Sequence, residues 1–283
     1  MAIKNITVIG AGTMGNGIAH VFAQSGYDVT LVDVAQAALD KAITTITSNL
    51  ARQVKKGTIT EADQTATLDR IKTETDLATS VKSADFVIEA ATERFDLKKT
   101  IFATLDANAP AGVILATNTS SISVTELAAA TGRATHVIGM HFFNPVPVMK
   151  LVEIIRGLAT TDEVYATVKA LTEGVGKTPV EVNDSPGFVS NRVLMPMINE
   201  AIYCVMEGVA KPEDIDTVMK LGMAHPMGPL QLADFIGLDV CLAILNVLHD
   251  GLGDTKYRAC PLLKKMVAAG RLGKKSGEGF YKY

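Results

Sequence analysis

The residues best suited to proton transfer in this sequence are His141 and Glu153. His141 lies near the end of a predicted strand, 136–143, and Glu153 lies in the next one, 150–155, after a tight Asn-Pro turn. Strands joined so closely can place the two side chains within hydrogen-bond reach, which fixes the imidazole tautomer and leaves the second ring nitrogen as a base. Such a pair suits the removal of a proton from an alcohol whose carbon gives up a hydride. The spacing alone favours the alternative, a structural His–Glu pair or two unrelated strand residues.

Two further polar residues are candidates for holding a substrate oxygen. Ser120 follows a predicted strand, 113–117, and ligands bind at the carboxyl edge of an open α/β sheet. The alternative for Ser120 is the capping of the next helix. Asn191 is a polar residue on an otherwise apolar predicted helix, 188–207, where it could polarise a carbonyl. Its alternative is a hydrogen bond between domains, because a buried amide needs a partner in any case.

These candidates depend on elements that begin with a glycine-rich turn. Residues 6–9 form a predicted strand, 10–15 the turn, 16–25 a helix, and 27–33 a second strand that ends in an acid. In such a turn the first glycine allows the tight bend, the second lets the backbone approach a pyrophosphate, and the third lets helix and strand pack closely. The helix N-terminus then offers N–H groups and a partial positive charge to phosphates. The alternative is a glycine-rich turn without a ligand, and the flanking elements argue against it.

The acid at the end of the second strand is Asp33, and it bears on the choice of cofactor. Its carboxylate can accept hydrogen bonds from the ribose hydroxyls of a dinucleotide. A 2′-phosphate would be repelled there, and Val34 and Ala35 supply no arginine to hold one. The predicted cofactor is therefore NAD rather than NADP.

Composition narrows the class of protein. The chain has 283 residues, of which 48% are apolar and 20% charged, as expected for a soluble globular protein of one large or two moderate domains. A net charge of −3 implies no polyanion-binding surface, so nucleic acid is not an expected partner. Three cysteines without CxxC spacing, and a start that runs straight into the first strand, predict a cytoplasmic protein. No apolar run is long enough to predict a membrane span, and because the histidines are scattered, we expect no metal site.

The order of elements predicts an α/β fold followed by helices. Strands alternate with helices up to residue 143, which indicates a mostly parallel, doubly wound, Rossmann-type sheet. The strand at 150–155 follows too closely for a helical crossover, so it must pair antiparallel or extend an edge. Residues 183–187 resemble a domain boundary. We therefore expect an NAD-binding domain, 1–184, and an all-helical C-terminal domain for substrate and dimerisation, 185–283.

The helical half has apolar faces that need a partner. The predicted helix at 188–207 is apolar on nearly every side, so it should be buried in a core or against another subunit. Further helices are expected at 228–248 and 261–269. An apolar domain of this size favours a homodimer, and the alternative is a monomer that buries these faces on its own sheet domain.

A pair of basic residues marks the end of a long predicted helix, 36–56. Arg52 and Lys56 are one turn apart and project from one face. The pattern alone favours a solvated basic end that complements the helix dipole. The functional alternative is an anchor for a substrate phosphate.

Several motifs together resemble the L-3-hydroxyacyl-CoA dehydrogenase family, and most closely its bacterial 3-hydroxybutyryl-CoA dehydrogenase group. The matching stretches run in order along the whole chain. They are Gly-Ala-Gly-Thr-Met-Gly (10–15), Asn-Thr-Ser-Ser (118–121), Gly-Met-His-Phe-Phe-Asn-Pro-Val-Pro-Val-Met (139–149), Asp-Ser-Pro-Gly-Phe-Val-Ser-Asn-Arg (184–192), His-Pro-Met-Gly-Pro (225–229) and Gly-Lys-Lys-Ser-Gly-Glu-Gly-Phe-Tyr (273–281).

The resemblance implies an NAD-dependent oxidoreductase that interconverts 3-hydroxyacyl-CoA and 3-ketoacyl-CoA. His141 would be the acid/base and Glu153 its partner, while Ser120 and Asn191 would contact substrate and transition state. The implied NAD site comprises Gly10, Gly12, Thr13, Met14, Gly15, Asp33, Glu93, Lys98, Asn118, Asn144 and Lys275. Arg52 and Lys56 match basic positions that meet the CoA portion. The family also implies a homodimer formed through the helical domain.

Three rivals remain. The first is a β-hydroxyacid dehydrogenase acting on free acids, a family whose base is a lysine, so the His141–Glu153 pair argues against it. The second is a non-catalytic NAD-binding protein, such as a redox sensor or a crystallin-like recruit. The third is a fragment of a multifunctional β-oxidation protein, and the start at Met1 and end at Tyr283 favour a standalone enzyme.

Overall fold

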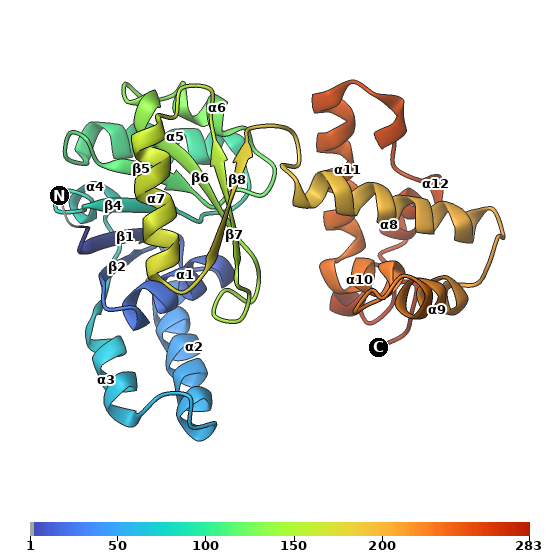
Figure 1. The fold of residues 1–283 in the computed structure, drawn as a ribbon, viewed down its shortest axis with the longest axis horizontal. Coiled ribbons are helices and arrows are strands. Elements are labelled where there is room, and N and C mark those ends of the chain that lie inside the picture. Colours follow the sequence, from blue (N-terminus) through green and yellow to red (C-terminus); the bar gives the residue numbers. More distant parts are fainter. Residues whose placement is uncertain (1–2) are drawn as a thin grey trace. The chain divides into compact units, whose positions relative to one another are not determined.

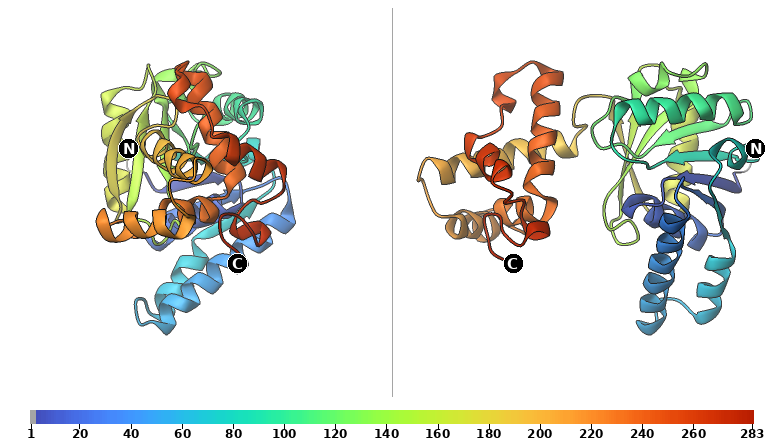
Figure 2. Two further views of the ribbon diagram at one scale, coloured as in Figure 1. Left: turned by 90° about the vertical axis from the view of Figure 1, so that its right-hand side faces the viewer. Right: turned by 180° about the vertical axis from the view of Figure 1, so that it is seen from behind.

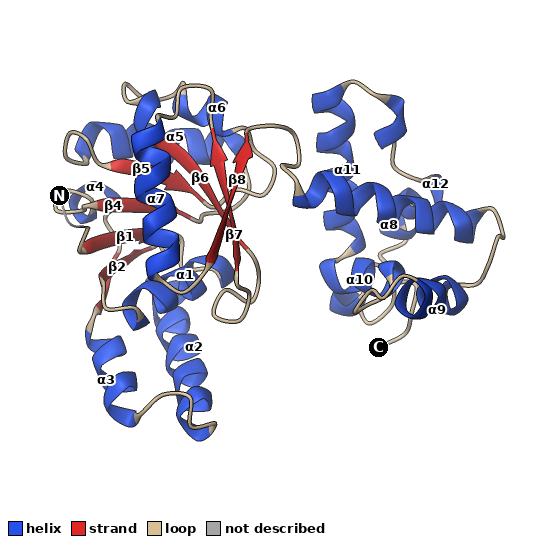
Figure 3. Ribbon diagram, in the orientation of Figure 1, coloured by secondary structure: helices blue, strands red, loops and turns tan. Residues whose placement is uncertain are grey.

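The structure, a computed structural model, describes residues 3–283, which fall into two compact units, one ending at Asp184 and the other beginning at Ser185. All the named strands belong to the first unit, and the second is helical (Figure 3). The strands are β1 (Asn5–Ile9), β2 (Asp28–Val32), β3 (Ile71–Glu74), β4 (Phe86–Glu89), β5 (Ile114–Thr117), β6 (Val137–Phe142), β7 (Leu151–Arg156) and β8 (Thr178–Asn183).

The eight strands form one sheet in the order β3-β2-β1-β4-β5-β6-β7-β8. Each neighbouring pair is parallel except β6 and β7, which are antiparallel. Every residue of β4, β5 and β6 is buried, as is typical of parallel strands covered by helices on both faces. The prediction of a mostly parallel, doubly wound sheet is confirmed, and of the two alternatives for the strand after the Asn-Pro break the structure has antiparallel pairing.

Helices cover both faces of the sheet. The helices of this unit are α1 (Thr13–Gln24), α2 (Gln36–Lys55), α3 (Glu61–Asp69), α4 (Leu77–Ser80), α5 (Phe95–Asn108), α6 (Val124–Ala128) and α7 (Asp162–Gly174), with a 3-10 turn at Ala134–His136. In Figure 1, α7 lies in front of the sheet, and the view from behind in Figure 2 shows α5 across the other face. Apolar residues of α1, α2 and α7 pack with the strands in one core cluster.

Two further local features of this unit are an edge strand that was not predicted and a capped helix. The edge strand β3 was not predicted, because its side chains alternate between half-buried and exposed and give no apolar run. The helix α3 has a complete capping box, in which Thr60 and Asp63 cap each other's backbone N–H groups, although aspartate is shorter than the usual partner.

The second unit is built around its own apolar cluster. Its helices are α8 (Ser190–Met206), α9 (Pro212–Gly222), α10 (Pro229–Ile236), α11 (Leu238–Leu252) and α12 (Pro261–Ala268), with 3-10 turns at Thr255–Tyr257 and Lys274–Ser276. The prediction of one helix over 228–248 is wrong, because Gly237, with a φ of 105°, separates α10 from α11. A glycine tolerates this positive φ, whereas other residues would be strained.

Buried carboxylates tie the elements of the helical unit together. Asp216 on α9 accepts hydrogen bonds from the backbone N–H groups of Leu230 and Gln231 at the start of α10, at 2.9 Å each, and from the Tyr281 hydroxyl at 2.8 Å. Asp234 on α10 accepts the N–H groups of Phe280 and Tyr281. The helical unit is therefore fastened by polar contacts as well as by its core.

Within residues 3–283, no single helix is long and apolar enough to cross a membrane. The pair α10 and α11 meets the length and composition test only when taken together, and the two helices are bent by 97° at Gly237.

Candidate active site

His141 and Glu153 face each other across the antiparallel pair. They are register partners in β6 and β7, and His141 Nδ1 lies 2.8 Å from Glu153 Oε2. Both residues are buried, with side-chain exposures of 10% and 3%. The imidazole also packs against the Phe143 ring, with centroids 4.5 Å apart. The predicted contact is present, and the bond through Nδ1 directs the ring's Nε2 away from Glu153.

The polar stretch after β5 is held by a glutamate. Glu93 Oε1 accepts the backbone N–H of Ser120 at 2.8 Å and that of Ser121 at 3.1 Å, and it accepts the Thr119 hydroxyl at 2.5 Å. The Ser120 hydroxyl lies 3.3 Å from the same oxygen. The cap of α6 is Ser123, whose hydroxyl accepts the Glu126 N–H, so the alternative of a helix cap does not describe Ser120.

A fully buried lysine lies beneath this glutamate. Lys98 Nζ is 2.8 and 2.9 Å from the two carboxylate oxygens of Glu89 and 3.3 Å from Glu93 Oε2. The side chains of Lys98 and Glu89 are 0% exposed. Thr117 at the end of β5 donates its hydroxyl to Glu89 at 2.7 Å. Lys98 is thus enclosed between two carboxylates, and Glu93 lies between Lys98 and the loop that carries Ser120.

The charge of Lys98 and several hydrogen bonds control the ionisation of Glu93. Burial alone would raise the pKa of its carboxyl group. The ammonium of Lys98 and the hydrogen bonds from Thr119 and Ser120 outweigh this effect and hold the pKa of Glu93 below its ordinary value. Glu93 therefore stays an anion that can accept the N–H groups of the loop.

The next loop residue upstream, Asn118, connects two strand ends. Its Oδ1 accepts the backbone N–H of Phe142 at 2.9 Å, and its own N–H donates to the carbonyl of Glu89 at 2.7 Å. The carboxyl ends of β4, β5 and β6 are therefore joined by hydrogen bonds at the edge where His141 lies.

The glycine turn has the geometry of a phosphate-binding turn. Gly10 has a φ of 96°, and a Cβ built on Gly15 would lie 1.6 Å from the Gly10 carbonyl oxygen, so the helix can approach the strand only without a side chain. A Cβ on Gly12 would meet nothing within 4 Å, so this side of the turn is open. Gly12 caps α1 without a side-chain hydrogen bond. Thr13 and Met14 form the first turn of the helix.

Asp33 lies where an acid is needed for a ribose. It follows β2, and its two carboxylate oxygens accept the backbone N–H groups of Ala11 at 2.8 Å and Ala35 at 3.1 Å. These bonds orient the carboxylate next to the glycine turn. The open turn, the start of α1 and this fixed carboxylate fit a dinucleotide that carries a free 2′-hydroxyl.

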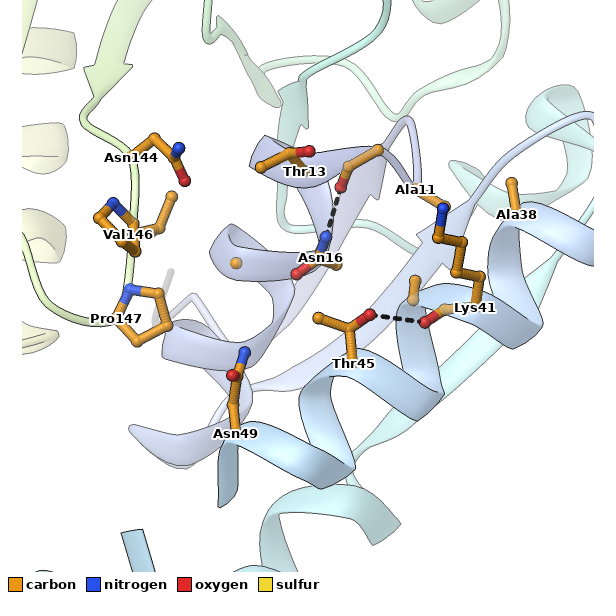
Figure 4. A pocket seen from close by; sticks show the side chains of 14 residues that line it. Ala11, Thr13, Asn16, Ala38, Lys41, Thr45, Asn49, Asn144, Val146 and Pro147 are labelled. Carbon is orange, nitrogen blue, oxygen red and sulfur yellow. Dashed lines mark hydrogen bonds between the residues drawn. The ribbon is translucent and has the colours of Figure 1, made fainter. Parts of the chain in front are cut away.

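A pocket of about 420 Å³ opens beside the glycine turn (Figure 4). Its walls are the start of α1, the first half of α2 and the loop between β6 and β7. The polar side chains that line it are those of Thr13, Asn16, Lys41, Thr45, Asn49 and Asn144. Lys41, Thr45 and Asn49 recur every fourth residue along α2. They are not among the residues predicted from the sequence: the four-residue spacing places them on one face of the helix, but it does not show that this face meets a cavity.

The remaining predicted site residues lie near the end of α2 and in the helical unit. Arg52 and Lys56 are exposed near the end of α2, and Arg52 Nη2 donates a hydrogen bond to Asn49 Oδ1, so it is linked to the rim of the pocket. In the helical unit, buried Asn191 is the second residue of α8, and Lys275 Nζ is 2.7 Å from Asp239 Oδ2. Among residues 3–283, no cluster of three or more potential metal ligands occurs.

Family models match both units. The NAD binding domain of 3-hydroxyacyl-CoA dehydrogenase matches residues 5–185, and the C-terminal domain of the same family matches residues 187–283. A probable 3-hydroxybutyryl-CoA dehydrogenase of Bacillus subtilis is 60% identical over 283 residues, which is 100% of this chain and 98% of the relative. The human mitochondrial hydroxyacyl-coenzyme A dehydrogenase is 43% identical over 99% of this chain and 91% of its own length.

A solved structure agrees with these matches. The crystal structure of (S)-3-hydroxybutyryl-CoA dehydrogenase from Ralstonia eutropha superposes with a TM-score of 0.97 at 54% identity, covering 100% of this chain and 99% of that one. The glycine turn and Asp33 belong to the part of the chain that matches the NAD-binding model. The chain therefore belongs to the 3-hydroxyacyl-CoA dehydrogenase family, as an enzyme with NAD as its cofactor.

Proposed function

We propose that this enzyme interconverts a short-chain L-3-hydroxyacyl-CoA, 3-hydroxybutyryl-CoA, and the 3-ketoacyl-CoA, acetoacetyl-CoA. The observation that carries the chemical step is the buried His141–Glu153 pair, with Nδ1 and Oε2 2.8 Å apart. The names of the relatives from Bacillus subtilis and Ralstonia eutropha support the choice of substrate.

In the proposed mechanism His141 moves a proton at its Nε2 atom. Glu153 accepts a hydrogen bond from the Nδ1–H group and stabilises the imidazolium. The ring can therefore take the proton of the 3-hydroxyl and return it in the reverse reaction. When bound, NAD supplies the nicotinamide that accepts the hydride. Ser120, held through its N–H by Glu93, would donate its hydroxyl to the substrate oxygen as charge develops there. Asn191 is the proposed contribution of the helical unit to the same oxygen.

The proposed cofactor residues act at three places. The glycine turn 10–15 takes the pyrophosphate at the start of α1. Asp33 accepts the adenosine ribose hydroxyls. Asn118, Asn144 and Glu93 belong to the nicotinamide end, and Lys98 acts there through Glu93, because its side chain is wholly buried. Lys275 is proposed as a contact from the helical unit.

The pocket beside α2 is the proposed place for the chain of the acyl-CoA. It is lined by amide, hydroxyl and ammonium groups, which suit the amides of a pantetheine arm. Arg52 and Lys56 extend this row of polar residues toward the end of α2 and would meet a CoA phosphate.

The protein is proposed to be cytoplasmic.

The helical unit is proposed to form a homodimer. Large apolar side chains of α8, α9, their connection and the residues next to the two helices are exposed in a single chain, among them Val189, Val193, Val209, Val218, Leu221 and Met223. Val193 is 68% exposed and Leu221 83%. Exposure on this scale along two helices suits a protein–protein interface.

The test is the oxidation of NADH followed by absorbance, with acetoacetyl-CoA as substrate. Parallel reactions replace NADH by NADPH, and acetoacetyl-CoA by free acetoacetate. We expect fast turnover only with NADH and the CoA thioester. Turnover of the free acid would favour a β-hydroxyacid dehydrogenase instead, and NADH binding without any turnover would favour the sensor or crystallin alternative.

A further inference from the structure

The loop between β6 and β7 is held by hydrogen bonds from a buried lysine. Lys177, which precedes β8, is only 8% exposed. Its Nζ donates to the carbonyl oxygens of Val146 at 2.6 Å and Met149 at 2.7 Å. Within residues 3–283 no carboxylate oxygen lies within 4.0 Å of this ammonium, so its polar partners there are backbone carbonyls of one loop.

A lysine in this place is costly. Burial lowers the pKa of Lys177, because an ammonium without a counter-ion is poorly stabilised away from water. An apolar side chain of similar length would fill the same space without that cost. What only the lysine supplies is a pair of N–H donors that join two residues of the loop, Val146 and Met149.

The loop also packs against α1. A Cβ built on Gly17 would lie 2.8 Å from Cβ of Val146, so the loop packs directly on the helix backbone at this glycine. Inside the loop, the Pro145 carbonyl accepts the N–H groups of Val148 and Met149. The loop is therefore held between Lys177 and Gly17.

The same loop forms one wall of the pocket beside α2. Asn144, Pro145, Val146 and Pro147 line the pocket. Figure 4 shows Asn144, Val146 and Pro147 across the pocket from Thr13, Asn16 and the side chains of α2. The position of the loop thus sets the width of the pocket. His141 precedes the loop by one short segment of strand, but its contact with Glu153 is fixed by the β6–β7 ladder and does not depend on the loop.

We propose that Lys177 is a positioning residue, which fixes the wall of the acyl-CoA pocket by binding the Val146 and Met149 carbonyls. This inference rests on the proposed function, because it assigns the pocket to the acyl-CoA substrate. It separates two tasks within one hairpin. The strands align the acid/base pair, and the lysine places the loop that receives the substrate.

The first test is the kinetics of Lys177→Met, a side chain of similar length without a donor. We expect the KM for acetoacetyl-CoA to rise about tenfold, which corresponds to about 1.4 kcal/mol of binding free energy, while kcat changes little. The matched control is Lys169→Met on the exposed face of α7, which should keep the wild-type KM. Equal KM values for the wild type and Lys177→Met would overturn the proposal.

The second test measures the loop itself and needs no substrate. Lys150 is exposed and directly follows Met149, so limited trypsin digestion reports on the loop through the fragments 1–150 and 151–283. We expect Lys177→Met to be cleaved there faster than the wild type and Lys169→Met. Cleavage at the wild-type rate would overturn the proposal, and so would faster cleavage with an unchanged KM.

A third variant acts on the loop from the other side and keeps Lys177. Gly17→Ala should displace Val146 and raise the KM for acetoacetyl-CoA in the same way, although alanine favours the helix by about 1 kcal/mol. An unchanged KM in this variant would count against the proposal. A wild-type enzyme that fails to turn over acetoacetyl-CoA would instead refute the proposed function, and that result is distinct from every outcome above.

Discussion

The first unit contains two buried pairs of a cation-forming side chain and a carboxylate, and the shortest distance is 2.8 Å in both. His141 and Glu153 lie on neighbouring antiparallel strands, with side-chain exposures of 10% and 3%. Lys98 and Glu89 lie on α5 and β4, and both are 0% exposed. The two contacts have the same length, but the partner of the carboxylate is an imidazole in His141–Glu153, the titratable pair, and an ammonium in Lys98–Glu89, the enclosed pair. The two pairs also differ in access to solvent.

The difference teaches how one sheet edge can serve two purposes. An imidazole can be neutral or charged near neutral pH, so a pair with a small opening can pass a proton to a ligand. The ammonium of Lys98 is enclosed by the carboxylates of Glu89 and Glu93, and its side chain has no access to solvent. We therefore infer that the first pair performs chemistry and that the second holds the Ser120 loop in place.

The largest effect is expected when the titratable pair loses its ring. His141→Gln should lower kcat by about 10²- to 10⁴-fold, because the general acid/base is absent, while the affinity for NADH stays the same. Steady-state assays give kcat, and fluorescence titration gives the affinity for NADH. His249→Gln is the control, since His249 lies 3.2 Å from a carboxylate on the surface of α11. Near-normal turnover of His141→Gln would remove the basis of the comparison.

A large loss of stability is expected when the enclosed pair loses its cation. Lys98→Met leaves the Glu89 and Glu93 carboxylates without their shared ammonium, so the free energy of unfolding should fall by about 3–5 kcal/mol. Urea denaturation measures this change. The control is Lys99→Met, on the exposed neighbouring position of the same helix, which should change stability little. Equal stability of the two variants would contradict a holding role for the buried pair.

The same variant has an expected pH signature. The pKa of Glu93 is lowered in the folded protein, so its contribution to stability is complete above the ordinary carboxyl range and is lost as the pH falls through that lowered pKa. Without Lys98 the pKa of Glu93 should rise toward or above its ordinary value, so this acid-induced loss of stability should become smaller. Thermal unfolding of Lys98→Met and Lys99→Met, followed from about pH 6 to pH 3, tests whether the melting temperature falls less steeply with acid in Lys98→Met.

A smaller effect is expected when the titratable pair keeps its geometry and loses its charge. In Glu153→Gln the amide oxygen can still accept the His141 Nδ1 hydrogen, so kcat should fall by about 10- to 100-fold, as for the loss of one charge-assisted hydrogen bond. The pH dependence of kcat should move to lower pH, because the imidazolium loses its stabilising charge. Glu163→Gln on exposed α7 is the control, and an unmoved profile would argue against the acid/base pair.

The smallest effect concerns one hydrogen bond of the enclosed pair. Thr117→Val removes the hydroxyl that donates to Glu89 at 2.7 Å and keeps the shape of the side chain. Stability should fall by about 1–3 kcal/mol, and the pH profile of kcat should not move. Chemical denaturation and steady-state kinetics on one preparation make both measurements. A moved profile would mean that the two pairs are coupled.

The sequence was sufficient for the parts of the site that follow from local pattern. The glycine turn, Asp33 and the antiparallel return to Glu153 are read from strand order and from residues close in the chain. Burial of charged side chains is different. Lys98 and Lys177 are indistinguishable in the sequence from exposed lysines such as Lys99, and only the packing of distant segments encloses them.

Other misses have equally local causes. The edge strand β3 buries too little of its surface to show an apolar period. The break at Gly237 was missed because the apolar residues of α10 and α11 follow one another without a polar interruption, and a lone glycine does not always end a helix. The pocket residues on α2 are polar and lie beside buried residues such as Ala42 and Ile46, and the pattern alone does not say which polar face meets a cavity.

The pairing of β6 with β7 has a consequence for insertions and deletions. His141 and Glu153 are opposite each other because the ladder aligns them, while residues 144–149 merely connect the strands. A graft that lengthens this connection would change the shape of the pocket and preserve the pair. Removal of one residue from β7 ahead of Glu153 would turn that side chain to the other face of the sheet. Specificity can therefore be redesigned a few residues away from a position that tolerates no change in length.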